Sequence, residues 1–145
     1  MVKFKFKFES VLNVKIIMEK KIQEEISLIE KEIKEYNHKR QIVIEERNRA
    51  RQSLKGIHCK VSEYLSFKIF DVNLSKVIKT IEKKIETLIG SKMSKQMELV
   101  EKKKERKVFE ILKDSQLQEY LLDERRNDLK ELNEIAIRNF NGIEW

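Results

Sequence analysis

The stretch KIQEEISLIEKEIKEY, residues 21–36, decides the fold. Its apolar residues are separated alternately by four and three positions, at Ile22, Ile26, Ile29, Ile33 and Tyr36. This spacing is the a/d repeat of a coiled coil, in which about 3.5 residues per turn keep one apolar row facing a partner helix. The stretch therefore predicts a long helix whose seam, the row of a and d residues, packs on a second helix.

The same repeat extends in both directions from this stretch. Downstream, Arg40 and Arg47 occupy polar seam positions, and the apolar seam residues are Val43, Ala50, Leu54, Ile57, Val61 and Tyr64. Upstream, the steps become 3, 4 and 4, which predicts a stutter at Val11, Val14, Met18 and Ile22.

A second helical pattern begins at Leu74 and keeps the same spacing through Ile78, Ile81, Ile85 and Leu88. We expect its seam then to shift by one residue, to Ile89, Met93, Met97, Val100 and Lys104. Further on, the expected seam consists of Val108, Ile111, Ser115, Gln118, Leu122, Arg125, Leu129, Leu132 and Ala136. Gly142 is expected to stop this helix.

Between the two patterns, Asp71, Asn73 and Ser75 can each cap a helix. Short connections usually join antiparallel neighbours, so the sequence predicts an all-α fold, a long antiparallel two-helix coiled-coil hairpin. The hairpin covers residues 11–145, with a first helix of about 11–68, a turn of about 69–75 and a second helix of about 76–141. An N-terminal Phe/Lys arm, residues 1–10, precedes it. Two separate helices that pair with other chains are the alternative.

The composition supports helices and excludes several other classes of protein. Of 145 residues, 39% are charged, 3 are glycine and none is proline, which does not fit a sandwich, a barrel or a Gly-rich nucleotide-binding fold. The net charge of +7 permits nucleic acid, an anionic membrane or an acidic protein as a partner. A single cysteine, the lack of a long apolar run and a start without a signal-peptide pattern predict a cytoplasmic protein.

Residues for catalysis or metal binding are sparse. His58 and Cys59 are adjacent, so on a helix they point about 100° apart, and His38 has no second ligand at metal spacing. No phosphate-binding glycine loop is present. We therefore expect no enzyme, no cofactor and no metal site.

Two basic segments leave a binding function open. The run KKKERK, residues 102–107, could follow phosphates or form a solvated helix surface. In the N-terminal arm, Phe4, Phe6 and Phe8 alternate with lysines. They could stack on bases, touch a membrane, or pack on the hairpin base or a protein partner. A basic coiled-coil nucleic-acid-binding protein and a generic homodimeric coiled coil are thus alternative functions.

Three segments resemble the flagellar FliJ family. FKFKFESVLNV, residues 4–14, is similar to the pattern that leads into the family's first helix. VIKTIEKKI, residues 77–85, resembles its second-helix opening, and ERRNDLKELNEIA, residues 124–136, resembles its closing pattern.

The resemblance implies a component of the flagellar type III protein export apparatus, cytoplasmic and peripheral to the membrane at the flagellar base. Such a stalk binds and promotes the hexameric export ATPase and also binds the cytoplasmic domain of the export-gate membrane protein and export chaperones. The expected ATPase-binding residues are Phe4, Phe6, Phe8, Leu129, Leu132 and Ala136, the last three paired with the first turns around Val11, Leu12 and Val14. The expected gate-binding residues are Val77, Ile81 and Leu88.

The glycines suggest a joint in this stalk. With a turn near residues 71–73, the numbers of paired residues sum to about 144, so Gly56 would face Leu88 and Gly90 would face Leu54. Because glycine weakens a helix by about 1 kcal/mol relative to alanine, two glycines at one height predict a hinge.

Overall fold

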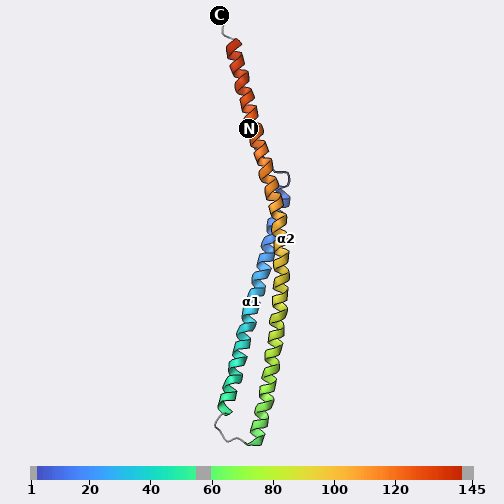
Figure 1. Cartoon of the computed structure of the whole chain (residues 1–145), viewed down its shortest axis with the longest axis vertical. Helices are drawn as coiled ribbons and strands as arrows, with labels where there is room; N and C mark the ends of the chain where they lie inside the picture. Colours follow the sequence, from blue (N-terminus) through green and yellow to red (C-terminus); the bar gives the residue numbers. More distant parts are fainter. Residues whose placement is uncertain (1–2, 55–59, 142–145) are drawn as a thin grey trace. The chain divides into compact units, whose positions relative to one another are not determined.

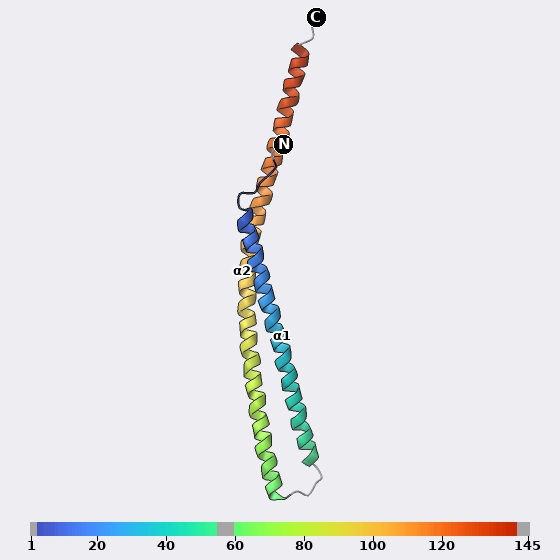
Figure 2. The same ribbon diagram turned by 180° about the vertical axis from the view of Figure 1, so that it is seen from behind.

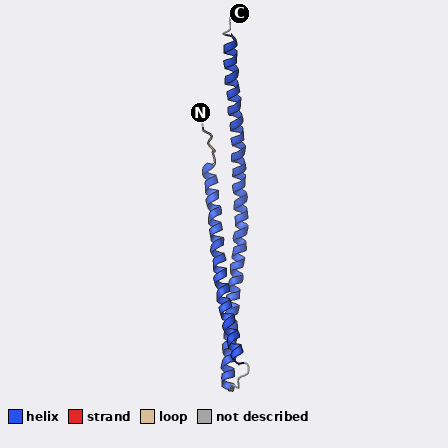
Figure 3. Ribbon diagram, turned by 90° about the vertical axis from the view of Figure 1, so that its left-hand side faces the viewer, coloured by secondary structure: helices blue, strands red, loops and turns tan. Residues whose placement is uncertain are grey.

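The computed structural model describes residues 3–54 and 60–141. Within these ranges it contains no strand and two helices, α1, Glu9–Leu54, and α2, Val61–Asn141 (Figures 1 and 3). The two helices pack against each other in antiparallel directions, because residues later in α1 form ion pairs with residues earlier in α2, as in Lys15 with Glu105 and Glu25 with Lys95. The predicted all-α helical hairpin is therefore confirmed.

The connection between the helices lies earlier in the chain than predicted. α1 ends at Leu54 and α2 begins at Val61, so the expected first helix of residues 11–68 and the expected turn at 69–75 are wrong. Asp71 does not cap a helix, because arginines of α1 bind its carboxylate. In the sequence, Gly56 is the signal that favours an earlier connection. Outside the described residues lie residues 55–59, which include His58 and Cys59, and the expected helix stop at Gly142.

Local hydrogen bonds account for the starts of both helices. The backbone N–H of Lys60 donates to the Glu63 carboxylate at 3.3 Å, which is half of a capping box. At the start of α1, the N–H of Glu9 donates to the Phe6 carbonyl at 3.2 Å. Glu63 and Glu9 also place negative charge in the first turn of their helices, where it interacts favourably with the positive end of the helix dipole.

The chain divides into two compact units, each built from parts of both helices. The hairpin unit comprises residues 20–100, and the terminal unit comprises residues 1–19 and 101–145. In the hairpin unit, α1 and α2 lie side by side in opposite views (Figures 1 and 2). The core of this unit is a single layer of seam residues, of which the most buried are 5–8% exposed: Ile22, Ile26, Ile78 and Leu88.

The α1 seam in the hairpin unit follows the predicted repeat. Its members from residue 22 to residue 54 are all buried or half-buried: Ile22, Ile26, Ile29, Ile33, Tyr36, Arg40, Val43, Arg47, Ala50 and Leu54. The expected continuation at Val61 and Tyr64 is wrong, because both belong to α2 and are exposed. Ile57 lies outside the described residues.

The α2 seam does not shift after Leu88, contrary to the prediction. It continues with the same spacing to Lys92 and Lys95, which are half-buried. Lys92 pairs with Glu30 at 3.2 Å and Lys95 with Glu25 at 2.8 Å across the helix interface, so charge is neutralised in the seam. The apolar residues expected there are instead 46–71% exposed: Ile89, Met93, Met97 and Val100.

Charged residues also fill the seam of the terminal unit. Leu12 is buried, and Lys15 and Glu19 follow it at steps of three and four. Lys15 donates to Glu105 at 2.8 Å, and Glu19 accepts from Arg106. The predicted stutter is therefore wrong, and the residues on which it rested are exposed: Val11, Val14 and Met18.

The register of the two helices also removes the predicted glycine hinge. In ion pairs such as Arg40 with Glu82, the numbers of the partners sum to about 120 rather than 144. Gly90 therefore lies near the level of Glu30, which pairs with Lys92, and not beside Leu54. Gly56 is outside the described residues.

Replacing Gly90 with alanine is expected to stabilise the protein by about 1 kcal/mol, because alanine loses less backbone entropy in a helix. Gly90 is helical and exposed, and a Cβ built there meets nothing within 4 Å. Urea unfolding followed by circular dichroism measures the change. Ser91→Ala, at the neighbouring exposed position, should give a smaller gain, and a loss of stability in Gly90→Ala would contradict the prediction.

Candidate partner-binding surfaces

The described residues offer surfaces rather than a chemical centre. Within residues 3–54 and 60–141, no group of three or more His, Cys, Asp or Glu side chains is placed to hold a metal ion. In the same ranges, neither helix has an apolar stretch long enough to cross a membrane. Exposed apolar and charged side chains are present on both units.

The N-terminal arm packs on α2 within the terminal unit. The Phe4 ring lies 5.5 Å from that of Tyr120, and the Phe8 ring lies 6.1 Å from that of Phe109, measured between centroids. Phe6 is buried, and its ring stands edge-on to Phe8 at 5.9 Å. Of the interpretations left open by the sequence, packing of the arm on the foot of the hairpin fits this arrangement. A buried Phe6 cannot stack on a nucleobase.

The last part of α2 carries an exposed apolar face within the terminal unit. Past Tyr120 the helix continues for 21 residues to Asn141, where no α1 residue lies beside it (Figure 2). Its apolar side chains are all exposed: Leu121, Leu122, Leu129, Leu132, Ile135, Ile137 and Phe140. Ala136 is exposed as well. The expected pairing of Leu129, Leu132 and Ala136 with Val11, Leu12 and Val14 is therefore wrong.

The earlier part of the terminal-unit seam in α2 was also misassigned. Val108 and Ile111, which were expected in the seam, are exposed. The seam consists instead of Arg106, Phe109, Lys113, Gln116 and Tyr120, which recur every three or four positions and are half-buried, as are the neighbouring Leu112 and Leu117. This row faces α1 and the arm, where Lys113 pairs with Glu9 at 2.8 Å. Val108 and Ile111 therefore lie on the exposed side of α2.

The three residues expected to bind the gate protein lie in different environments. Leu88 is buried and Ile81 is half-buried in the seam against α1, so neither offers a free surface. Val77 is exposed, and Phe70, also exposed, lies seven residues earlier on the same side of α2. Phe70 and Val77 therefore form the accessible part of this surface.

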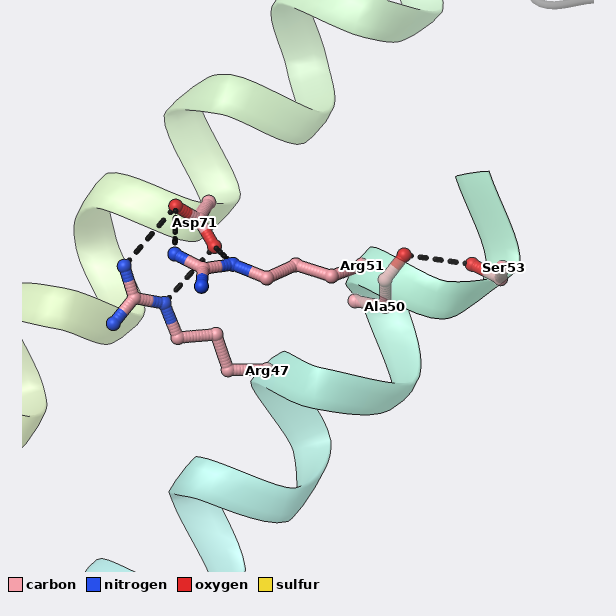
Figure 4. Close-up of polar contacts among 5 residues, drawn as sticks. All are labelled: Arg47, Ala50, Arg51, Ser53 and Asp71. Carbon is pink, nitrogen blue, oxygen red and sulfur yellow. Dashed lines mark hydrogen bonds and ion pairs between the residues drawn. The ribbon is translucent and has the colours of Figure 1, made fainter. Parts of the chain in front are cut away.

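Asp71 is the centre of an ion-pair cluster that no sequence pattern indicated (Figure 4). Arg47 donates from Nε and Nη2 to its two carboxylate oxygens at 3.0 and 3.2 Å, and Arg51 does so at 2.9 and 3.1 Å. Such bidentate pairs are among the stronger side-chain hydrogen bonds. Nearby, the Ser53 hydroxyl donates to the Ala50 carbonyl at 2.8 Å in the last turn of α1. The cluster ties that turn to α2.

Hydrogen bonds from Arg47, and then from Arg51, hold the pKa of Asp71 well below its usual range. Because the pKa is lower in the folded state, Asp71 stabilises the fold above the unfolded-state value of about 4 and loses this effect as the pH falls. Asp71→Asn is therefore expected to lower the urea midpoint at pH 7, with a gap that narrows from pH 5 toward pH 2.

Asp114→Asn is the matched control for Asp71→Asn. Asp114 is exposed on α2, so its substitution should leave the urea midpoint nearly unchanged at every pH. A gap between Asp71→Asn and the wild type that stays constant with pH would contradict the role given to the Asp71 carboxylate.

The basic run at residues 102–107 is largely neutralised. Three of its five cations pair with carboxylates, Lys102 with Glu105, Lys104 with Glu101, and Arg106 with Glu19 and Glu110. A protein binds nucleic acid when its unpaired cations neutralise phosphates and release the counterions of the nucleic acid. Cations that are already paired with carboxylates contribute less, so these ion pairs weaken the case for nucleic-acid binding. Within the run, Arg106 and Glu105 pair across to α1, with Glu19 and Lys15, whereas Lys102 and Lys104 pair within α2.

One exposed row near the start of α2 was missed. Val61, Leu65, Ile69 and Val72 recur at steps of four, four and three, and each is exposed. The helical spacing was visible in the sequence, but assigning Val61 to the first helix concealed it.

The comparison with protein families covers the arm and both helices. The family model described as flagellar FliJ protein matches residues 4–143 of the 145-residue chain. No curated protein and no solved structure matches the chain. Since the family match spans nearly the whole length, the chain belongs to the flagellar FliJ family and is a component of the flagellar protein export apparatus.

Proposed function

We propose that the protein is a non-enzymatic stalk that binds the hexameric flagellar export ATPase and promotes its activity. The stalk also links the ATPase to the cytoplasmic domain of the export-gate membrane protein and to export chaperones. It acts in the cytoplasm and is held at the membrane through these partners. Family membership supports the apparatus, and the exposed apolar face of α2 after Tyr120 is the observation that carries the role of the stalk.

The ATPase contact is assigned to Leu129, Leu132 and Ala136. They are exposed on a stretch of α2 that extends about 30 Å past Tyr120, at 1.5 Å per residue. A contiguous apolar face of this kind marks a protein interface. A single helix presents different side chains to each side, so it can contact the subunits of a surrounding ring unequally, while hydrolysis takes place on the ATPase.

The arm supports this contact by holding α1 on α2. Phe6 is buried, so it acts through packing, whereas Phe4 and Phe8 are half-buried and can contribute an edge to the partner. For the gate protein, the accessible surface is Phe70 and Val77. Ile81 and Leu88 support it from the seam.

The double substitution Leu129→Asn, Leu132→Asn is expected to reduce stimulation of the cognate export ATPase at least tenfold. Both side chains are exposed, so helicity and thermal stability should stay close to wild type. The measurement is ATP hydrolysis by the ATPase against stalk concentration. Met97→Asn, also exposed on α2, is the control and should stimulate normally. Full stimulation by a folded double variant would contradict the assignment.

A further inference from the structure

The first third of α2 presents a continuous row of residues on the side away from α1, which we name the outer stripe. Its members recur every three or four positions, and all are exposed: Val61, Leu65, Ile69, Val72, Lys76, Lys79 and Lys83. At about 100° per residue, this row lies roughly opposite the seam residues Asp71, Leu74 and Ile78. The outer stripe belongs wholly to the hairpin unit and differs from the Phe70–Val77 face.

The first half of the outer stripe is apolar. Val61, Leu65, Ile69 and Val72 are 49–76% exposed, although they occupy three consecutive turns of a stable helix. Single exposed apolar residues are normal, but four in one row form a surface that gains free energy when another phase covers it.

The second half of the outer stripe is basic. Lys76, Lys79 and Lys83 have no ion-pair partner among the described residues, although Glu82 and Glu86 lie nearby in sequence. Further along α2, by contrast, Lys92 and Lys95 are paired with carboxylates of α1. The three ammonium groups of the stripe are therefore available to an external anion.

We propose that the outer stripe binds an anionic lipid surface directly. Apolar side chains of an amphipathic helix enter the boundary between headgroups and acyl chains, and lysines attract acidic lipids. The order along the stripe, apolar and then basic, lets the Val61 end sit deepest while the lysine stems reach back to the phosphates. The stripe spans about 33 Å along one side of a single helix, which suits a planar surface with phosphates at many points.

This contact goes beyond the proposed function, in which partners alone hold the protein at the membrane. It does not depend on that function, because the purified chain should bind lipid without an ATPase or a gate protein. An acidic protein groove could also accept an apolar and basic row, and it is the occupant left if vesicles fail to bind.

Vesicle co-sedimentation of the full chain tests the proposal. Vesicles of phosphatidylglycerol and phosphatidylethanolamine should bind the protein at least tenfold more tightly than vesicles of phosphatidylcholine, and binding should fall as salt rises. Equal binding to both kinds of vesicle, or no binding to either, would overturn the proposal.

Two triple variants separate the stripe from net charge. Lys76→Gln, Lys79→Gln, Lys83→Gln is expected to lose at least tenfold in binding to the anionic vesicles. The control variant carries the same charge change on exposed lysines of α1: Lys20→Gln, Lys31→Gln, Lys34→Gln. This control should keep most of its binding to the anionic vesicles. An equal loss in both would show that only net charge matters and would refute the stripe.

A fluorescent residue tests which face enters the lipid. In a Trp145→Phe background, which removes the natural tryptophan, Ile69→Trp should shift its emission to the blue when anionic vesicles are added. Leu28→Trp on α1 is the control, since Leu28 is 62% exposed and Ile69 is 65% exposed, and its emission should not change. A blue shift of the emission of Leu28→Trp without one for Ile69→Trp would place the lipid on α1 instead of α2 and would reject the proposal.

Discussion

Replacing Phe6 with alanine is expected to destabilise the terminal unit by about 3 kcal/mol, the low end for a buried phenylalanine. Phe6 is 7% exposed, and its ring packs edge-on against Phe8, which in turn contacts Phe109 of α2. Its carbonyl also accepts the first hydrogen bond at the start of α1. Loss of the ring leaves a cavity where the arm joins the two helices. Urea unfolding followed at 222 nm measures the effect.

Phe4→Ala is the comparison for this prediction. Phe4 is half-buried and contacts the Tyr120 ring at 5.5 Å, so the cost should be clearly smaller than for Phe6. If both substitutions cost less than 1 kcal/mol, the arm is not part of the fold and is free to serve as a binding segment. If Phe6→Ala unfolds the terminal unit and Phe4→Ala does not, a loss of ATPase stimulation by the Phe6→Ala variant is caused by lost structure and not by a lost contact with the ATPase.

Leu88→Ala is expected to destabilise the hairpin unit by about 2–3 kcal/mol. Leu88 is buried in a seam only one layer thick, so neighbouring side chains can relax, and the cost should stay near the lower end for buried leucine. Chemical unfolding of the full chain gives the value, provided that the transition is fitted for two units.

Val77→Asn separates stability from partner binding on the same helix. Val77 is exposed, so its substitution should change stability by less than about 0.5 kcal/mol while weakening binding to the cytoplasmic domain of the gate protein. If Val77→Asn binds the gate normally, the Phe70–Val77 face is not the gate contact. If Leu88→Ala proves neutral, the observed register of the seam is refuted.

The helical hairpin could be predicted because its strongest signals are local. An unbroken 3–4 spacing from Ile22 to Tyr36, few glycines and no proline favour helices whatever the partner. The position of the connection was less visible. Asp71, Asn73 and Ser75 are good capping residues, and nothing local shows that Arg47 and Arg51 would claim Asp71 instead.

The candidate surfaces were predicted only in part. Leu129 and Leu132 belong to an apolar row, but apolar residues recur every three or four positions both in a buried seam and on an exposed helix face. The sequence therefore does not show which of the two this row is. Only the pairing of α1 with α2 shows that they are exposed and that Leu88 is buried. The outer stripe was hidden for the same reason, because the seam spacing of the first helix continues through Val61 in the sequence.

The sequence by itself determined that this chain forms long helices, that α1 has one apolar row from Ile22 onward, and that the family is one of flagellar export. Only the tertiary structure decided the register and the identity of the second seam. In both units that seam includes cations as well as apolar residues, such as Lys95 after Leu88 and Arg106 before Phe109, while nearby apolar residues such as Met97 and Val108 are exposed. The physical reason is that the register depends on contacts between residues far apart in sequence, and carboxylates on α1 neutralise the cations that this register places in the seam.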